Sequence, residues 1–403
     1  MLEKNSLLLK MKNFLDIPSL SPIKRLPKNF WKPCIDDFVC VLMPVSTLII
    51  WGICAIIGHW DAPFCYWDGP NYVYAAKTLY RIPDKNPWTS GFGYPPSYFA
   101  CHLPGLPIII RIISTICLNS FWIGNALTIL LIPAILAFVF RRLLIVYGAV
   151  TDPTWTTALL SLVPLRFLIY HSVGASEPLF MLYSFLAFIF FKSDQILFVV
   201  LALCGACITR VEGLIMVGTI GLCYLLRLDL LKSIITGLSL LSYVLLVVFH
   251  KIRFGIYDAY IKFNQGRQKL IGPFPFFELI RNAKQGMNVS FLSCYYLYLP
   301  FIVGSSMLLS NVLPFAIMCI AYILYVSLLF HIDILRYSIP AYVLALLVGF
   351  DPILSSPQGK RAIKYLVPLY IVIALRYSVM QICSNRAPLW FMKDALRVPT
   401  VYF

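Results

Sequence analysis

Long apolar runs recur along this 403-residue chain from one end to the other. They constrain the fold strongly, because about 20 consecutive apolar residues form a helix that crosses about 30 Å of hydrocarbon. Only 12% of the residues are charged, about half of the share usual in soluble proteins. The sequence therefore predicts an all-α, polytopic transmembrane protein with about 10–12 spans. The candidate spans cover residues 38–58, 121–140, 155–171, 178–191, 196–209, 213–226, 233–250, 291–309, 311–330, 337–350 and 364–380.

The formal charge of +16 is interpreted as membrane-related, so no nucleic-acid partner is expected. In a membrane protein, basic residues mark cytoplasmic loops and contact anionic lipid headgroups. Residues 1–36 are polar and basic, which predicts a cytoplasmic tail before an uncleaved first span. Residues 37–383 then form a single transmembrane domain, and residues 384–403 form a C-terminal tail.

The segment PGLPIIIRIISTICL, residues 104–118, decides the predicted topology. It is short, begins with prolines and contains Arg111, so it is expected to be interfacial or re-entrant. External loops then cover residues 59–120, 251–290 and 331–337. The positive-inside rule supports this arrangement, because it leaves five basic groups in the cytoplasm. These are the N-terminal tail, Arg141 with Arg142, Lys192, residues 227–232 and residues 360–364.

The stretch FCYWDGPNYVYAAKTLY in the first external loop carries the leading catalytic candidate, Asp68. Tyr66, Trp67 and Tyr72 are aromatics typical of a membrane interface, and YVYAAKTLY suggests an amphipathic helix lying along the membrane surface. An acid held there would meet the polar head of a lipid-linked substrate, which favours a general base. A solvated loop carboxylate is the alternative. Asp61, in HWDAPF, is the rival for the same role and is otherwise assigned a supporting one.

The loop KIRFGIYDAYIKFNQGRQKLIGPFPFFELIRNAK holds seven basic residues against two acidic ones. Such an excess is atypical of an external loop. Either the topology differs here or the cations bind an anion. Because Arg and Lys neutralise phosphate, Lys262, Arg267 and Lys269 are predicted to contact a donor phosphate.

The segment HIDILRYSIPAY places His331, Asp333 and Arg336 at the mouth of a span. An arginine at a membrane edge is costly unless it is paired, so it is a functional candidate. Arg336 is predicted to bind phosphate, with His331 in a supporting role. The alternative is that Asp333 and Arg336, three residues apart, pair with each other on one helix.

Glu177 in GASEPLF, with Arg210 and Glu212 in TRVEG, lies at span ends on the same predicted face. Arg210 is expected to pair with Glu212 or Glu177 and to fasten helices together, so Glu177 and Arg210 are supporting residues. The sequence has no HExxH or DxD motif, no Walker loop and no Rossmann fingerprint. No metal site and no cofactor are therefore predicted.

In their order along the chain, these motifs resemble the GT-C glycosyltransferases, which use polyprenyl-phosphate sugars. Within that group the chain is most similar to the GPI mannosyltransferase 2 (PIG-V) family and its bacterial relatives. YWDGPNYVYAAKTLY and HLPGLPIIIRIIS resemble the family's WD loop and its proline-rich approach to an apolar run. The likeness extends from about Tyr66 to Tyr342. Its later elements are GASEPLFMLYSFLA, ACITRVEGL, YDAYIKFNQGRQK and LRYSIPAY.

The resemblance implies a GT-C-like first external loop with interfacial helices. It also implies inverting transfer of a sugar, usually mannose, from polyprenyl or dolichyl phosphate to a lipid-linked or glycan acceptor. In this interpretation Asp68 is the general base and Arg336 lies near the donor phosphate. The setting would be GPI anchor biosynthesis in the endoplasmic reticulum membrane, or a bacterial inner membrane, and a small membrane partner subunit is compatible with it.

Two alternatives remain open at the level of the sequence. The first is a transporter or flippase of an anionic lipid-linked substrate, in which the basic loop would act as a gate. The second is a non-catalytic subunit of a glycosylation complex.

Overall fold

The described part of the chain is helical throughout. The structure, a computed structural model, gives the backbone alone for residues 265–267 and 288–297. Every regular element among the described residues is a helix, apart from one isolated β-bridge between Tyr66 and Arg386. The predicted all-α fold is confirmed. The described stretches are residues 17–23, 26–86, 91, 93–267, 288–327 and 334–401.

Four helical stretches, 22 to 28 residues long, are apolar enough to cross a membrane. At 1.5 Å per residue they measure about 33–42 Å, which exceeds the hydrocarbon thickness. The chain is therefore a multi-pass membrane protein by length and composition of its helices. The stretches are Ile35–Ile56 (η1, Ile35–Val41, and α2, Leu42–Ile56), α7 (Phe121–Tyr147), Leu230–Phe254 (α13, Leu230–Gly237; η3, Leu238–Leu240; α14, Leu241–Phe254) and α21 (Pro357–Ser384).

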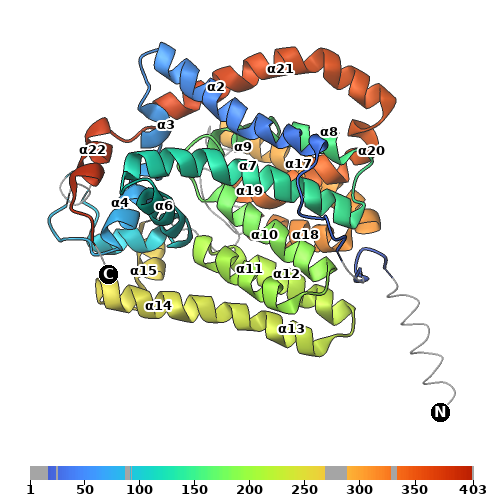
Figure 1. Cartoon of the computed structure of the whole chain (residues 1–403), viewed down its shortest axis with the longest axis horizontal. Coiled ribbons are helices and arrows are strands. Elements are labelled where there is room, and N and C mark those ends of the chain that lie inside the picture. Colours follow the sequence, from blue (N-terminus) through green and yellow to red (C-terminus); the bar gives the residue numbers. More distant parts are fainter. Residues whose placement is uncertain are drawn as a thin grey trace.

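Shorter helices complete the bundle seen in Figure 1. The predicted spans 196–209 and 213–226 coincide with two of them, because Arg210 adopts extended backbone and ends the first. The shorter helices are α8 (Pro153–Leu160), α9 (Leu165–Tyr170), α10 (Glu177–Lys192), α11 (Ile196–Thr209), α12 (Gly213–Leu226), α18 (Leu313–Ser327), α19 (Ile334–Leu344), the π-helical η4 (Ala345–Gly349) and α20 (Asp351–Leu354). The bundle also contains the 24-residue helix α17 (Asn288–Asn311).

The predicted span over residues 155–171 is not one continuous helix. The chain forms two short helices there, α8 and α9, separated by residues 161–164. Pro164 has no N–H to donate, and its ring would crowd the carbonyl four residues back in a continuing helix. Arg166, in the first turn of α9, follows the break and lines a polar cavity.

The first external loop folds into α3 (Ala62–Cys65), α4 (Gly69–Thr78), η2 (Pro96–Cys101) and α6 (Gly105–Ile116). The 12 residues of α6 extend only about 18 Å. That length is shorter than the hydrocarbon thickness of a bilayer, but so are those of α11 and α12, with 14 residues each. The expectation that residues 104–118 do not span therefore stays a prediction. Within the protein, α6 packs against α4 and α7.

The expectation that α4 lies along the membrane surface is wrong. All ten of its residues are buried, because α6 covers it and α22 (Leu389–Arg397) packs against it. Tyr66 and Tyr72 point into the protein, where their rings lie against Tyr170 and His102. Trp67, 61% exposed, is the residue of this trio that retains an outward position.

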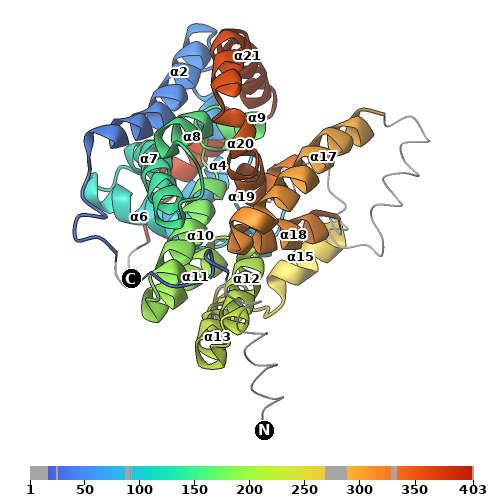
Figure 2. The same cartoon turned by 90° about the vertical axis from the view of Figure 1, so that its right-hand side faces the viewer.

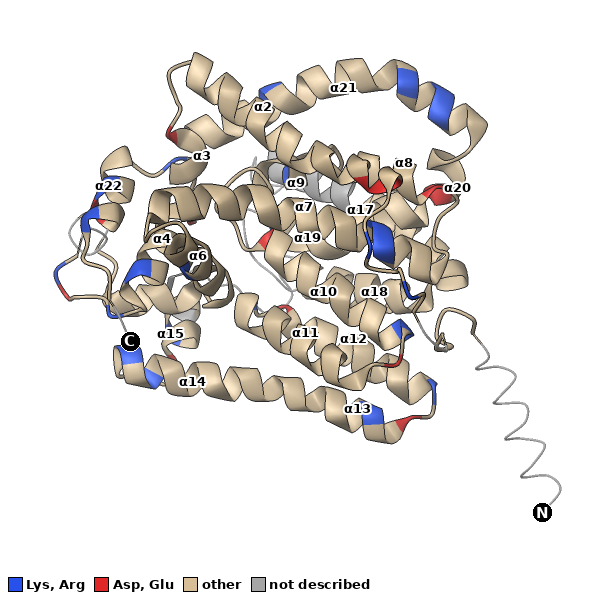
Figure 3. Cartoon of the chain, viewed as in Figure 1, with Lys and Arg blue, Asp and Glu red and all other residues tan. Residues whose placement is uncertain are grey.

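Lysines and arginines lie at both ends of the bundle, and one group of them lies beside the described N-terminal segment (Figure 3). Lys192 donates hydrogen bonds to the carbonyls of Pro18 and Ser21, both at 2.7 Å. Arg141 and Arg142 bind the Asp37 carboxylate at 2.7 and 2.5 Å. The groups predicted to be cytoplasmic are thus tied to the N-terminal segment.

The C-terminal segment lies at the other end of the bundle, beside α3 and α4 (Figure 1). The sequence assigned residues 384–403 to a tail, whereas the structure makes part of it a helix, α22, that is integral to the loop region. Lys77 donates to the Leu396 carbonyl, and Arg111 donates to the Val401 carbonyl at 2.7 Å. Figure 2 shows α2 and α21 side by side along one edge of the molecule.

Candidate functional site

A polar cavity of about 540 Å³ lies where the first external loop meets the ends of several bundle helices. Asp68 comes from the start of α4 and Arg210 from the C-terminal end of α11, while Arg336 comes from the first turn of α19. Residues of α15 (Ala259–Arg267) form a further wall. All of these positions are helix ends or first turns, so the polar groups gather at one end of the bundle.

The turn before α4 aims Asp68 into the cavity. Trp67 has a φ of 33°, in the left-handed region that non-glycine residues adopt rarely. Its N–H donates to the Asn385 carbonyl at 3.2 Å, so the C-terminal segment holds the turn. Asp68 occupies the N-cap position of α4 without capping it. Its carboxylate is therefore available for contacts in the cavity.

Asp68 binds two donors there. Arg336 Nη1 lies 3.0 Å from Asp68 Oδ2, and His102 Nε2 lies 3.2 Å from Oδ1. Burial alone would raise the pKa of Asp68, but the Arg336 guanidinium and the His102 hydrogen bond outweigh it and hold that pKa well below its ordinary value. The side chain is 25% exposed. Asp68 is thus an ionised carboxylate with access to the cavity.

Arg336 is held from behind by a buried ionic network. Its Nε donates to Glu177 Oε1 at 2.5 Å, and Arg210 Nη1 donates to the same oxygen at 2.6 Å. Arg210 also binds Glu212 at 2.7 Å. Arg210 therefore pairs with both of the partners expected from the sequence, Glu177 and Glu212. The alternative pairing of Arg336 with Asp333 involves a residue outside the described part of the chain.

His102 is a site residue that the sequence analysis missed. It shares the first external loop with Asp68, 34 residues away. Its ring lies edge-on to Tyr98 and Tyr72, at centroid distances of 5.0 and 5.3 Å. These rings, with Asn71 at 3.2 Å from Nε2, hold the imidazole against Asp68. His102 is therefore placed to orient the carboxylate.

Arg166 is the second residue that was missed. It lines the cavity from α9 and donates to Gln381 Oε1 at 3.3 Å and to Tyr377 Oη at 3.5 Å, both on α21. An arginine inside an apolar stretch is a functional candidate in a membrane protein, and this signal was available in the predicted span 155–171. The cavity is thus lined by three guanidiniums, those of Arg166, Arg210 and Arg336.

Lys262 is not among the residues that line the cavity, and its predicted phosphate contact stays a prediction. The α15 helix turns Tyr260, Phe263 and Asn264 toward the cavity. Lys262 is 64% exposed and pairs with Asp258 at 3.1 Å. Of the other predicted site residues, Lys269 and His331 lie outside the described residues, as does the side chain of Arg267.

Asp61, the rival candidate, lies apart from the residues that line the cavity. It is buried, and both of its oxygens lie 3.0 Å from Arg386 Nη1. This ion pair joins the first loop to the C-terminal segment beside the Trp67 turn. The geometry fits the supporting role assigned to Asp61.

The described residues contain no group of three or more His, Cys, Asp or Glu side chains that could hold a metal ion. No protein-family model matches the chain, and no curated protein matches it either. Fold and site together define an all-α protein with four candidate membrane spans and a charged cavity at one end of its bundle.

Proposed function

We propose that the protein is an integral membrane glycosyltransferase of the GT-C type. It transfers a sugar, mannose in this proposal, with inversion from a polyprenyl or dolichyl phosphate donor to a lipid-linked or glycan acceptor. The observation that carries the proposal is the pairing of Asp68 with Arg336 at 3.0 Å in an accessible polar cavity. A general base and a phosphate-binding cation are the two groups that this chemistry requires.

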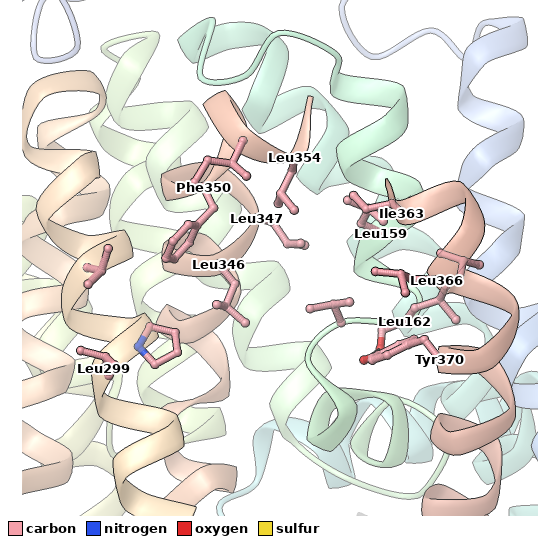
Figure 4. Close-up of a pocket in the computed structure, with 15 residues that line it drawn as sticks. Leu159, Leu162, Leu299, Leu346, Leu347, Phe350, Leu354, Ile363, Leu366 and Tyr370 are labelled. Carbon is pink, nitrogen blue, oxygen red and sulfur yellow. Dashed lines mark hydrogen bonds between the residues drawn. The ribbon is translucent and has the colours of Figure 1, made fainter. Parts of the chain in front are cut away.

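An apolar groove supports a lipid-linked donor. It has a volume of about 570 Å³ and lies between α17 on one side and α21 on the other, with η4 and the end of α8 behind (Figure 4). Tyr370 of α21 lines the groove, and Tyr377, seven residues further along, contacts Arg166 at the cavity. Seven helical residues extend about 10 Å. A polyprenyl chain in the groove would therefore reach the cavity with its phosphate.

The proposed topology has eleven crossings. The tail would lie in the cytoplasm, and the cavity and α22 would face the lumen of the endoplasmic reticulum or the bacterial periplasm. The basic residues tied to the N-terminal segment support this orientation through the positive-inside rule. The crossings are η1 with α2, α7, α8 with α9, α10, α11, α12, α13 with α14, α17, α18, α19 with η4, and α21.

Arg336 links donor binding to base strength in this mechanism. An incoming phosphate competes with Asp68 for the Arg336 guanidinium, while Glu177 keeps that guanidinium in place. As Asp68 loses part of this contact, its pKa rises and it becomes a better proton acceptor. Donor binding would thus activate the base.

The transfer step then follows from the geometry of an inverting displacement. The acceptor hydroxyl oxygen attacks the anomeric carbon from the face opposite the phosphate and forms the new C–O bond. The old bond to the phosphate oxygen breaks, and its electron pair stays on the departing polyprenyl phosphate. Asp68 takes the hydroxyl proton. Arg336, with Arg166 and Arg210 on the cavity wall, stabilises the charge that grows on the phosphate.

The position of the cavity favours transfer over transport. A transporter that works by alternating access binds its substrate near the middle of the membrane. Here Glu177, Arg210 and Arg336 lie at helix ends or in first turns, at the end of the bundle opposite the N-terminal segment.

The substitution Asp68→Asn tests the proposal. In membranes supplied with polyprenyl phosphate mannose labelled in the sugar, transfer to endogenous acceptors should fall by about 10²–10⁴-fold, since general-base catalysis contributes that much. Donor retention by the purified variant, measured by native mass spectrometry, should stay within a few-fold of wild type.

Asp258→Asn is the matched control, because Asp258 is an exposed carboxylate paired with Lys262 outside the cavity. Its transfer rate should be unchanged. Full transfer activity in Asp68→Asn would refute a base at this position. If Asp68→Asn moved donor across sealed vesicles at the wild-type rate, with no transfer by either protein, the transporter would be favoured.

A further inference from the structure

A second groove lies on the other side of α21, away from the charged cavity. It runs between α2, α8 and α21 and has a volume of about 620 Å³. Its walls are apolar, and Val45 and Ile49 of α2 are more than 40% exposed there. Leu159, Leu162 and Val367 line both this groove and the one between α17 and α21, so α21 lies over α8 with a groove on either flank.

Two lysines of α21 stand at one mouth of this groove. Lys360 and Lys364 both line it, and a spacing of four residues puts them on the same helix face. Lys360 pairs with Asp152 at 2.6 Å and lies 5.8 Å from the Trp155 ring centroid. Lys364 is exposed and has no ion pair within the described part of the chain. The mouth therefore carries two cations against one carboxylate.

This mouth lies at the end of the bundle that holds the N-terminal segment. Asp152, which pairs with Lys360, lies two residues before Thr154. The Thr154 hydroxyl accepts a hydrogen bond from Arg141, and Arg141 in turn binds Asp37 beside the N-terminal segment. The charged cavity lies at the opposite end. The lysines are therefore unsuited to the donor phosphate of the proposed reaction, and they face the other leaflet.

The dimensions of the groove match one lipid chain in one leaflet. Lys364 and Leu375 both line it, and they are 11 residues apart on a continuous helix. That separation corresponds to about 16 Å, close to half of the hydrocarbon thickness of a bilayer. An apolar trough of one-leaflet length that ends in paired lysines is complementary to a lipid with an anionic head.

We propose that this groove is a binding site for an anionic phospholipid of the leaflet at the N-terminal end. The phosphate contacts Lys360 and Lys364, and an acyl chain fills the space between α2 and α21. Because the buried residues of α21 all lie in its C-terminal half, a lipid against the N-terminal half completes the packing of this helix and stabilises the fold. The site is separate from sugar transfer and does not depend on it.

Lipid retention and thermal stability test the site in detergent-purified protein. Phosphatidylglycerol should be retained in native mass spectrometry and should raise the unfolding temperature. Phosphatidylcholine with the same acyl chains, and inorganic phosphate alone, should do neither. Lys364→Gln should weaken phosphatidylglycerol binding by about fivefold, the contribution expected of one lysine near an anionic headgroup.

Ala158→Phe is the second variant, because Ala158 lines the groove and a larger side chain would fill it without changing any charge. It should also lose phosphatidylglycerol. Lys393→Gln is the matched control, since Lys393 is an exposed lysine on α22 at the other end of the molecule, and it should bind normally. Equal retention of both lipids, or unchanged binding in Lys364→Gln and Ala158→Phe, would overturn the proposal, as would occupation of the groove by a protein helix in the purified complex.

Discussion

The guanidinium of Arg336 binds two carboxylates, the buried one of Glu177 and the accessible one of Asp68. Glu177 is fully buried and shared with Arg210, so it fixes the position of Arg336. Asp68 is partly exposed and takes the opposite side of the same guanidinium. Removing one partner from a buried pair of this kind costs about 3–5 kcal/mol. At this residue the stability of the fold and the chemistry of the cavity are coupled.

The low pKa of Asp68 predicts how kcat/KM depends on pH. With Arg336 present that pKa lies well below its ordinary value, so Asp68 stays ionised and kcat/KM should be flat through mildly acidic pH. In Arg336→Gln, burial is no longer outweighed and the pKa of Asp68 rises. The acidic limb of the residual kcat/KM profile should then move to higher pH.

The same shift has a consequence for stability. Because the folded-state pKa of Asp68 is depressed, its ionised form stabilises the wild-type fold above the unfolded pKa of about 3.9, and this contribution is lost as the pH falls through the folded value. The conservative variant Arg336→Lys restores the positive charge, so the acidic limb of its kcat/KM profile should lie closer to that of the wild type. Arg397→Gln, at an exposed position, serves as the control. An acidic limb that stays in place in Arg336→Gln would contradict the role of Arg336.

At the scale of elements, the close approach of α17 and η4 shapes the lipid groove. A Cβ added at Gly304 would collide with the Ala345 carbonyl, and one added at Gly349 would collide with the Gly304 backbone. Small residues allow such contacts between membrane helices. Leu346 and Leu347 of the same π-helical turn line the groove. The two glycines therefore set the position of one groove wall.

Gly349→Ala should destabilise the protein by about 1–3 kcal/mol, the usual cost of overpacking. Thermal unfolding in detergent measures the effect. Gly218→Ala in α12 is the matched control, because open space surrounds Gly218, and it should unfold at or above the wild-type temperature. Equal unfolding temperatures for the two variants would show that the contact between α17 and η4 is not tight.

How much of the fold was predictable depends on whether the deciding signal is local. The ends of α11 and α12 were predicted correctly, because apolar runs there stop at a short polar turn. The break between α8 and α9 was missed, because the run stays apolar across Pro164. The burial of α4 was also missed, because it depends on α22, more than 300 residues further along the chain.

The same distinction applies to the candidate site. Asp68, Glu177, Arg210 and Arg336 were selected as charges at span ends, and the structure brings them together. Their roles in catalysis stay predictions. The importance of His102 was not visible, because its partner Asp68 lies 34 residues away. The basic loop left open which of its cations lie at the cavity, since a charge count does not say which helix face a side chain occupies.

At the scale of the whole molecule, the two described ends of the chain lie at opposite ends of the bundle (Figure 1). The N-terminal segment binds Lys192, whereas the C-terminal segment binds Lys77 and Arg111 of the first loop. The proposed topology of eleven crossings puts these two ends on opposite sides of the membrane. The cavity then shares its side with the C-terminus.

Tags on the two termini test this topology in sealed vesicles of known orientation. Protease added outside inside-out vesicles should remove an N-terminal tag and leave a C-terminal one. Labelling of Cys34, exposed beside the N-terminal segment, should follow the N-terminal tag in a variant that retains it as the single cysteine. Removal of both tags from the same side would require an even number of crossings and a different side for the cavity.

The most direct measurement of the central claim is the structure of the protein with a polyprenyl phosphate sugar bound. The account predicts the phosphate within about 3 Å of the Arg336 guanidinium, the anomeric carbon facing Asp68 across room for an acceptor hydroxyl, and the lipid chain between α17 and α21. A donor phosphate bound at the Lys360 end of the bundle, or a sugar held on the far side of Arg336 from Asp68, would contradict it.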